Sequence, residues 1–148
     1  MLNAVIDIWN SSTLEVANIS GIAWSLTIQP LNSAINSRSV ALGGNSLGLP
    51  THPRGGSIVL LILSATWNNE SDNSFVQRVA DTFLASIVSG SKHSGTFNRF
   101  IDLNHADRKQ DPISGYGPTS KARMQAVSKK YDPLGVFQKQ LPRGFKLF

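Results

Sequence analysis

The sequence predicts a mixed fold of helices and strands, of the α+β or α/β class. Apolar residues recur at helical spacing in some segments, and at strand spacing or as an unbroken run in others. These segments follow one another in the order helix, strand, strand, helix, strand, helix, which is typical of sheets covered by helices. With 148 residues, 41% of them apolar and 16% charged, the chain has the size and composition of one domain or of part of a larger one.

The N-terminal segment is expected to form one helix and one strand. Residues 2–10 carry apolar side chains at helical spacing, namely Leu2, Val5, Ile6 and Trp9. The polar run that begins at Asn10 is expected to end this helix. Apolar residues then alternate with smaller or polar ones over residues 22–29, which predicts a half-buried strand. Pro30 is expected to end the strand because proline has no N–H to donate to a neighbouring strand.

The middle of the chain predicts a second strand and the longest helix. Residues 57–67 form a nearly continuous apolar run, which favours a central strand. The preceding residues 31–56 are rich in turn-forming residues, and Gly43-Gly44 is expected to supply a backbone turn with positive φ. Residues 75–88 place apolar side chains at positions i, i+3 and i+4, so they predict a helix that ends at Gly90.

The last part of the chain is expected to contain a short strand, a helix and an extended end. The strand is assigned to residues 96–104, and the helix begins at Pro118 and stops at Asp132-Pro133. The residues from Val136 onward are expected to be extended. Only three strands are predicted, and long loops separate them, which is unusual in a compact domain. The chain therefore reads as part of a sheet whose other strands lie elsewhere.

The charges are unevenly distributed along the chain. The formal net charge is +5, but residues 1–107 carry five basic and seven acidic side chains. Residues 108–148 carry two Asp and nine basic residues, namely Arg108, Lys109, Lys121, Arg123, Lys129, Lys130, Lys139, Arg143 and Lys146. A basic segment of this kind suits a solvated helix face, an anionic ligand or an acidic protein surface. No DNA- or RNA-reading motif accompanies it, so no nucleic-acid partner is expected.

Several other classes of function and location are disfavoured. The chain has no cysteine, which excludes disulfides, thiol nucleophiles and cysteine-held metals. The three histidines are His52, His93 and His105, and none is spaced as a metal ligand pair, so no metal site is expected. No apolar run reaches the roughly 20 residues of a membrane helix, and no signal peptide is recognisable at Met1. Three tripeptides match the N-glycosylation pattern, at Asn10, Asn18 and Asn69.

The most polar cluster at a predicted strand end is the run from Asp102 to Asp107. If the backbone is extended there, Asp102 and Asn104 point to one side and His105 to the other. A carboxylate and an amide on one side could recognise a polar ligand. A local network of turns is the alternative interpretation of the same residues.

Four segments in this order resemble the C-terminal end of fungal FAD-linked oxidoreductases of the berberine bridge enzyme-like group, in the PCMH-type FAD-binding superfamily. They are Phe100–Asp107, Gln110–Gly117, Val127–Gln138 and Pro142–Leu147. The run Lys130-Tyr-Asp-Pro-Leu-Gly-Val-Phe-Gln138 is the most specific of these similarities. Residues 23–31 and 43–49 also resemble the substrate domain of that group.

The resemblance implies an α+β fold with a partial antiparallel sheet flanked by helices, about half of a flavoenzyme substrate domain. It assigns residues 1–103 to that substrate domain. Residues 104–148 would form a C-terminal helix and an extended tail that return to the FAD domain. The FAD-anchoring domain itself would lie outside the chain, so tight FAD binding by this chain alone is not expected, and a separate FAD-binding domain or chain is a possible partner.

The resemblance also implies a site. Asn104 matches an asparagine that lies close to the flavin, and His105 is expected beside it as a second cofactor contact. Asp102 stands where a tyrosine often acts as a base, and His105 replaces a second tyrosine, so these two are the candidate catalytic residues. Arg143 replaces a usual glycine.

The function implied is oxidation of a small organic molecule, such as an alcohol, a sugar or a secondary metabolite, by hydride transfer to FAD. The chain alone is expected to be inactive. The alternative is a noncatalytic binding or scaffold protein derived from a truncated flavoenzyme. Members of the group are often secreted, which is compatible with the glycosylation tripeptides, but the sequence leaves the compartment open.

Overall fold

A computed structural model describes residues 1–49 and 57–148 of the chain. His52, one of the three histidines, therefore lies outside the described residues. The chain forms two compact units. The first comprises residues 1–29 and 60–98, and the second comprises residues 30–59 and 99–148. Helices and strands are mixed along the chain, which confirms the α+β prediction.

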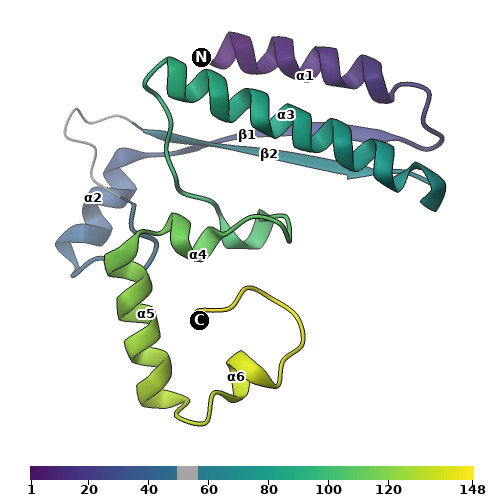
Figure 1. Cartoon of the computed structure of the whole chain (residues 1–148). Helices are drawn as coiled ribbons and strands as arrows, with labels where there is room; N and C mark the ends of the chain where they lie inside the picture. Colours follow the sequence, from purple (N-terminus) through teal and green to yellow (C-terminus); the bar gives the residue numbers. More distant parts are fainter. Residues whose placement is uncertain (50–56) are drawn as a thin grey trace. The chain divides into compact units, whose positions relative to one another are not determined.

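The first unit is built on two strands and two long helices. Strands β1 (Ala23–Leu31) and β2 (Ile58–Thr66) pair with each other and run in opposite directions. Helices α1 (Leu2–Val16) and α3 (Asn73–His93) contact each other and cover one face of this sheet (Figure 1). A short 3-10 helix, η1 (Glu70–Asp72), precedes α3.

The core of the first unit lies between the two helices and the sheet. Its buried side chains are Val5, Val16, Trp24, Val76, Val79, Phe83 and Ile87. Trp24 on β1 is 8% exposed, and Trp9 and Trp67 pack against the same core. Alternate residues of the two strands contribute to this packing, namely Trp24 and Leu26 of β1 and Leu61, Leu63 and Ala65 of β2, as the alternation of side chains along a strand requires.

Helix α1 is longer than the sequence pattern predicted. It continues through Asn10 and the three hydroxyl residues after it, and ends at Val16. The hydroxyls of Ser11, Ser12 and Thr13 donate hydrogen bonds to carbonyl oxygens one turn earlier, on Asp7 and Trp9. Because these side chains bond inside the helix, they do not compete with its backbone.

Ser12 also connects α1 to the sheet. Its side chain is 4% exposed, and its Oγ donates to the Trp9 carbonyl at 2.7 Å. The same Oγ accepts the indole N–H of Trp24 at 3.0 Å. The hydroxyl therefore supplies the partner of a buried indole donor.

We expect Ser12→Ala to lower the free energy of unfolding of the first unit by about 1–3 kcal/mol, because the Trp24 N–H loses its partner while it stays buried. Urea unfolding followed by tryptophan fluorescence measures this change. Ser11→Ala is the control, since Ser11 is exposed and bonds only within its own helix, and it should change stability by about 0.5 kcal/mol or less. Equal losses of stability in the two variants would contradict the role of Ser12 as the partner of the buried Trp24 N–H.

Three further boundaries differ from the sequence-based predictions. Helix α3 does not end at Gly90 but at His93, and Gly95 follows with φ +64°. Pro30 lies inside β1, which is tolerated because β1 pairs with β2 alone among the residues that the structure describes. Residues 33–41, expected to be turn-rich, form helix α2 (Ser33–Ala41), whose start is capped by the Asn32 side chain accepting from the Ala34 N–H.

The predicted third strand is absent from the described residues. Residues 96–102 are neither helix nor strand, and a 3-10 helix follows them. The backbone N–H groups of Thr96 and Phe97 donate to the Ser91 carbonyl at the end of α3, so they are not available to a sheet. Strand β2 consequently pairs with β1 alone among the described residues and is not the central strand that its apolar run suggested.

The second unit is mainly helical. It contains α2, the 3-10 helix η2 (Leu103–His105) and the helices α4 (Pro112–Gly115), α5 (Pro118–Tyr131) and α6 (Val136–Lys139). The predicted start and end of α5 are confirmed. The segment from Val136 onward was expected to be extended. Its first four residues form α6 instead, because both carboxylate oxygens of Asp132 accept N–H groups at the start of α6, while residues 140–148 form neither helix nor strand.

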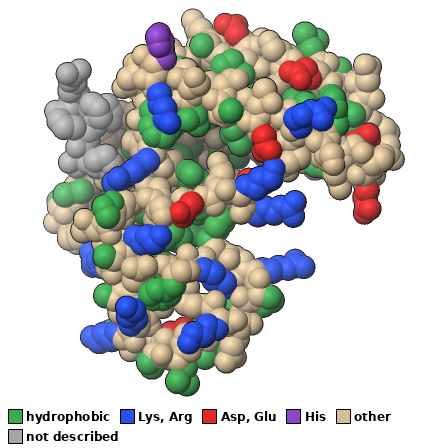
Figure 2. Space-filling model, viewed as in Figure 1, with side chains coloured by type: hydrophobic (Ala, Val, Ile, Leu, Met, Phe, Trp, Pro, Cys, Tyr) green, Lys and Arg blue, Asp and Glu red, His purple; other side chains and the backbone are tan. Residues whose placement is uncertain are grey.

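Turns and surface charge follow the sequence in the second unit. Gly43 and Gly44 have φ of +98° and +81°, as the expected turn requires. Figure 2 shows Lys and Arg side chains spread over the region where Figure 1 places α5 and α6. Within residues 1–49 and 57–148, no helix combines the length and the apolar character needed to cross a membrane.

Candidate functional site

The predicted site residues meet in a single 3-10 turn of the second unit. Asp102 is the N-cap of η2, and its carboxylate accepts the Asn104 backbone N–H at 3.4 Å. Asp102 Oδ2 lies 2.6 Å from Nδ1 of His105. The extended backbone expected from the sequence would have separated these two side chains. That expectation was wrong, because residues three apart lie on the same side of a 3-10 helix.

The contact between Asp102 and His105 has the geometry of an orienting carboxylate and a base. With the ring proton on Nδ1, His105 donates to Asp102, and its Nε2 is left to accept a proton from another molecule. The His105 side chain is 48% exposed and that of Asp102 is 25% exposed, so the pair is accessible from solvent. Protonated His105 would instead form an ion pair with Asp102.

Asn104 lies between these two residues in the sequence and is exposed. Its backbone is held by Asp102, and its side chain carries both a hydrogen-bond donor and an acceptor. The structure thus brings all three predicted site residues to one turn. Their roles toward a cofactor or a substrate stay predictions.

Tyr116 belongs to the same cluster and was not identified from the sequence. Its side chain is 6% exposed and its ring stacks on Phe100, with centroids 5.6 Å apart and planes 20° apart. Burial raises the pKa of the Tyr116 phenol above its usual value, and the nearby charge of Asp102 adds to this increase. A backbone hydrogen bond from Leu103 acts in the opposite direction. The phenol therefore stays protonated at neutral pH next to η2.

Two glycines flank Tyr116 and let this segment approach Arg99 closely, and they are the signal that the sequence did offer. A Cβ on Gly115 would lie 2.8 Å from the Arg99 carbonyl oxygen. A Cβ on Gly117 would collide with the Arg99 guanidinium, and Gly117 has φ +92° and ψ +160°, a conformation that only glycine adopts readily. An aromatic residue between two glycines thus marks a close approach of two backbone segments.

We expect Gly117→Ala to destabilise the second unit by about 1–3 kcal/mol, because alanine is strained at this φ and ψ. The amide NMR signals of residues 99–131, followed during urea unfolding, measure this loss. Gly90→Ala is the control: Gly90 lies within helix α3, and a Cβ there would meet only Met1 Cε at 3.7 Å. That substitution should stabilise the first unit by up to about 1 kcal/mol. If Gly90→Ala destabilised the protein while Gly117→Ala did not, the backbone conformations assigned to these two glycines would be wrong.

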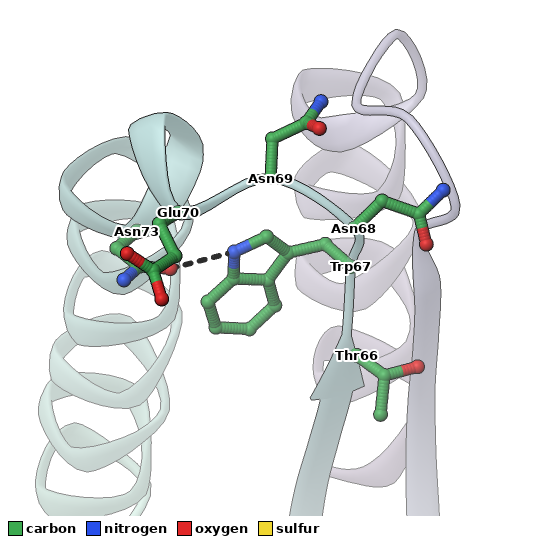
Figure 3. A pocket seen from close by; sticks show the side chains of 6 residues that line it. All are labelled: Thr66, Trp67, Asn68, Asn69, Glu70 and Asn73. Carbon is green, nitrogen blue, oxygen red and sulfur yellow. Dashed lines mark hydrogen bonds between the residues drawn. The ribbon is translucent and has the colours of Figure 1, made fainter.

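A separate cavity of about 300 Å³ lies in the first unit, at the end of β2. Trp67 projects from the strand end and its indole N–H donates to Asn73 Oδ1 on α3 at 2.8 Å, while Asn69 points away from the ring (Figure 3). Glu70 is the only charged residue that lines it. This cavity holds none of the predicted site residues. Among the described residues, no group of three or more His, Asp or Glu side chains could hold a metal ion.

Comparison with known proteins identifies relatives in fungi. The chain is 35% identical over 133 residues to the FAD-dependent monooxygenase drtC of Aspergillus calidoustus, over 88% of this chain and 25% of that protein. It is 32% identical over 120 residues to the FAD-dependent monooxygenase sdcF of Emericella nidulans, over 81% of this chain and 25% of that protein. It is also 32% identical to the oligopeptidase PhomG' of Diaporthe leptostromiformis, over 99% of this chain but 12% of that protein.

These similarities support an FAD-linked oxidoreductase family at modest identity. The chain spans about a quarter of the length of the FAD-dependent monooxygenases drtC and sdcF. No protein-family model matches the chain. No solved structure matches it either.

Proposed function

We propose that this chain is the C-terminal part of an FAD-dependent oxidoreductase of the berberine bridge enzyme-like group in the PCMH-type superfamily. The observation that carries the proposal is the similarity, along most of the chain, to a quarter of several FAD-dependent monooxygenases. In this proposal residues 1–103 are a portion of the substrate domain. Residues 104–148 are the segment that returns to an FAD-binding domain outside the chain.

The residues of η2 fit the edge of a flavin but do not hold FAD by themselves. The carboxylate of Asp102, the ring of His105 and the amide of Asn104 offer both donors and acceptors on one exposed turn. Such a set suits the polar edge of a flavin ring or a substrate hydroxyl. The glycine-rich segment 43–48, however, opens no helix among the described residues, so it lacks the usual cradle for phosphates. We therefore expect this chain alone to lose FAD on dialysis.

The chemistry assigned to the site separates the roles of cofactor and protein. When bound, FAD supplies a ring that accepts a hydride from a small alcohol, sugar or secondary metabolite. His105 Nε2 accepts the proton of the substrate hydroxyl, while Asp102 holds Nδ1–H and stabilises the imidazolium that forms. Asn104 orients the bound molecule. Tyr116 and the backbone of Leu103 hold the turn in place.

The transcript that encodes this chain tests the proposal. We expect its sequence on the 5′ side of the Met1 codon to continue in frame into an FAD-binding domain. A transcript that encodes these 148 residues alone, in a cell without a separate matching FAD-binding domain, would contradict it.

The second candidate function is a noncatalytic binding or scaffold protein that pairs with a separate FAD-binding chain. The observation that favours it is the exposure of several large apolar side chains, because uncovered apolar surface is what a partner chain would bury. Leu14, Leu42 and Leu134 are 77%, 88% and 78% exposed. Co-purification of a flavoprotein with the tagged chain would support this function, and a lone monomer in the extract would count against it.

A further inference from the structure

The second unit contains an apolar cavity that the proposed function does not use. It has a volume of about 350 Å³, within the range of about 300–1,000 Å³ that is usual for small-molecule sites. Its apolar walls come from one face of α5, from α6 and from the C-terminal tail. The residues concerned are Met124, Val127, Tyr131, Phe137 and Leu147.

The wall made by the tail is fixed by hydrogen bonds on both sides. The Leu147 carbonyl accepts from Gln125 Nε2 at 2.6 Å, and the Leu147 N–H donates to Gln138 Oε1 at 2.9 Å. Next to it, the Lys146 ammonium donates to the carbonyls of Phe137, Leu141 and Arg143. The cavity is therefore bounded by a tail that is tied to both α5 and α6.

The polar groups of the cavity favour an anion. Among the described residues, Asp132 is the only carboxylate that lines it, and both of its oxygens already accept N–H groups of Val136 and Phe137. Arg123 is the only cation of the described residues that lines it, and no described carboxylate pairs with its guanidinium. A guanidinium at the edge of an apolar cavity pairs well with a carboxylate.

The surrounding charge has the same sign. Residues 108–148 carry nine Lys and Arg but two Asp, and both Asp residues cap helices: Asp111 accepts the Ser114 N–H, and Asp132 caps α6. The Lys129 ammonium lies 5.6 Å from the ring centroid of Phe148 in the tail, and the Lys130 ammonium lies 5.2 Å from the ring centroid of Tyr131. An anion that approaches residues 108–148 therefore meets many cations. The two carboxylates in this segment already accept backbone N–H groups.

We propose that this cavity binds a small amphiphilic monoanion, an alkyl or aryl carboxylate whose apolar body lies between α5 and the tail and whose carboxylate pairs with Arg123. The apolar walls supply affinity for the body of the ligand. The guanidinium selects the carboxylate over an alcohol or a cation of the same length.

Titration of the full chain with decanoate, followed by amide NMR signals, tests this site. We expect saturable shifts at residues 123–147. Decanol should bind about tenfold more weakly, because it lacks the charge that pairs with the guanidinium, and decyltrimethylammonium more weakly still. Equal binding of the three probes, or shifts spread over the whole chain, would overturn the proposal.

Substitutions separate the charge from the apolar walls. Arg123→Gln should weaken decanoate binding by about tenfold and leave decanol unchanged, and Arg123→Lys should restore most of the loss. Phe137 is 65% exposed, so Phe137→Ala should leave the fold intact and weaken both probes. Arg108→Gln removes the same charge from an exposed residue outside the cavity and serves as the control. If Arg108→Gln weakens decanoate binding as much as Arg123→Gln does, general charge attraction explains the binding. The proposed pairing of the carboxylate with Arg123 is then wrong.

Discussion

His105→Ala is expected to slow flavin reduction by about 10²- to 10⁴-fold in a flavoprotein that contains this chain, because in the proposed function His105 accepts the substrate proton. A suitable protein is a chimaera in which the 148 residues replace the matching quarter of the relative drtC. Anaerobic stopped-flow absorbance, with the substrate of the parent protein, measures the rate. Flavin content should not change, since the base is not what retains FAD.

Two further variants define the role of His105. His93→Ala is the matched control, because His93 is an exposed histidine at the end of α3 in the first unit, and it should leave the rate unchanged. Asp102→Asn should slow reduction less than His105→Ala does, since it keeps the ring but loses the carboxylate that orients Nδ1. An unchanged rate of flavin reduction in His105→Ala would show that His105 does not accept the substrate proton.

Phe83→Ala is expected to have the largest effect on stability, a loss of about 3–5 kcal/mol in the first unit. Phe83 is 2% exposed and packs with Val5 of α1 and Ile87 of α3, so its removal leaves a cavity between the two helices. Urea unfolding followed by tryptophan fluorescence reports on this unit, because all three tryptophans lie in it.

Leu14→Ala is the control for that loss. Leu14 lies on α1, two residues before the core residue Val16, but its side chain is 77% exposed. Its truncation should change stability by about 0.5 kcal/mol or less. If Leu14→Ala destabilised the protein as much as Phe83→Ala, the packing of α1 on α3 would need to be reassigned.

The long periodic segments could be predicted from the sequence. Residues 75–88 and 118–131 have the spacing or the end signals of helices, and residues 58–65 have the length and composition of a strand, and each forms the expected element. In these segments local preference and core packing agree, so the pattern alone was sufficient.

The missed features depend on contacts that no periodicity reveals. Residues 11–13 look like a helix end until their hydroxyls are seen to bond to the preceding turn. The helix α2 lies in a stretch rich in serine and asparagine and begins with an Asn32 cap. Residues 96–104 have strand-like composition, but their first N–H groups cap α3 and their last residues form η2.

The candidate site was only partly predictable for the same reason. The polar cluster and its three residues were found from residue types and resemblance. The contact between Asp102 and His105 follows from the 3-10 turn, which the sequence pattern did not predict. Tyr116 joins the cluster through packing on Phe100, eleven residues beyond His105, and only its flanking glycines hinted at that approach.

Flavin retention tests the central claim most directly. The 148-residue chain and the drtC chimaera are loaded with FAD, dialysed side by side, and compared by visible absorbance. We expect the chimaera to keep its flavin spectrum and the chain alone to lose it, because the proposed function places the residues that anchor FAD outside this chain. A chain that stays yellow alone, or a folded chimaera that releases flavin readily while the parent protein retains it, would contradict the account.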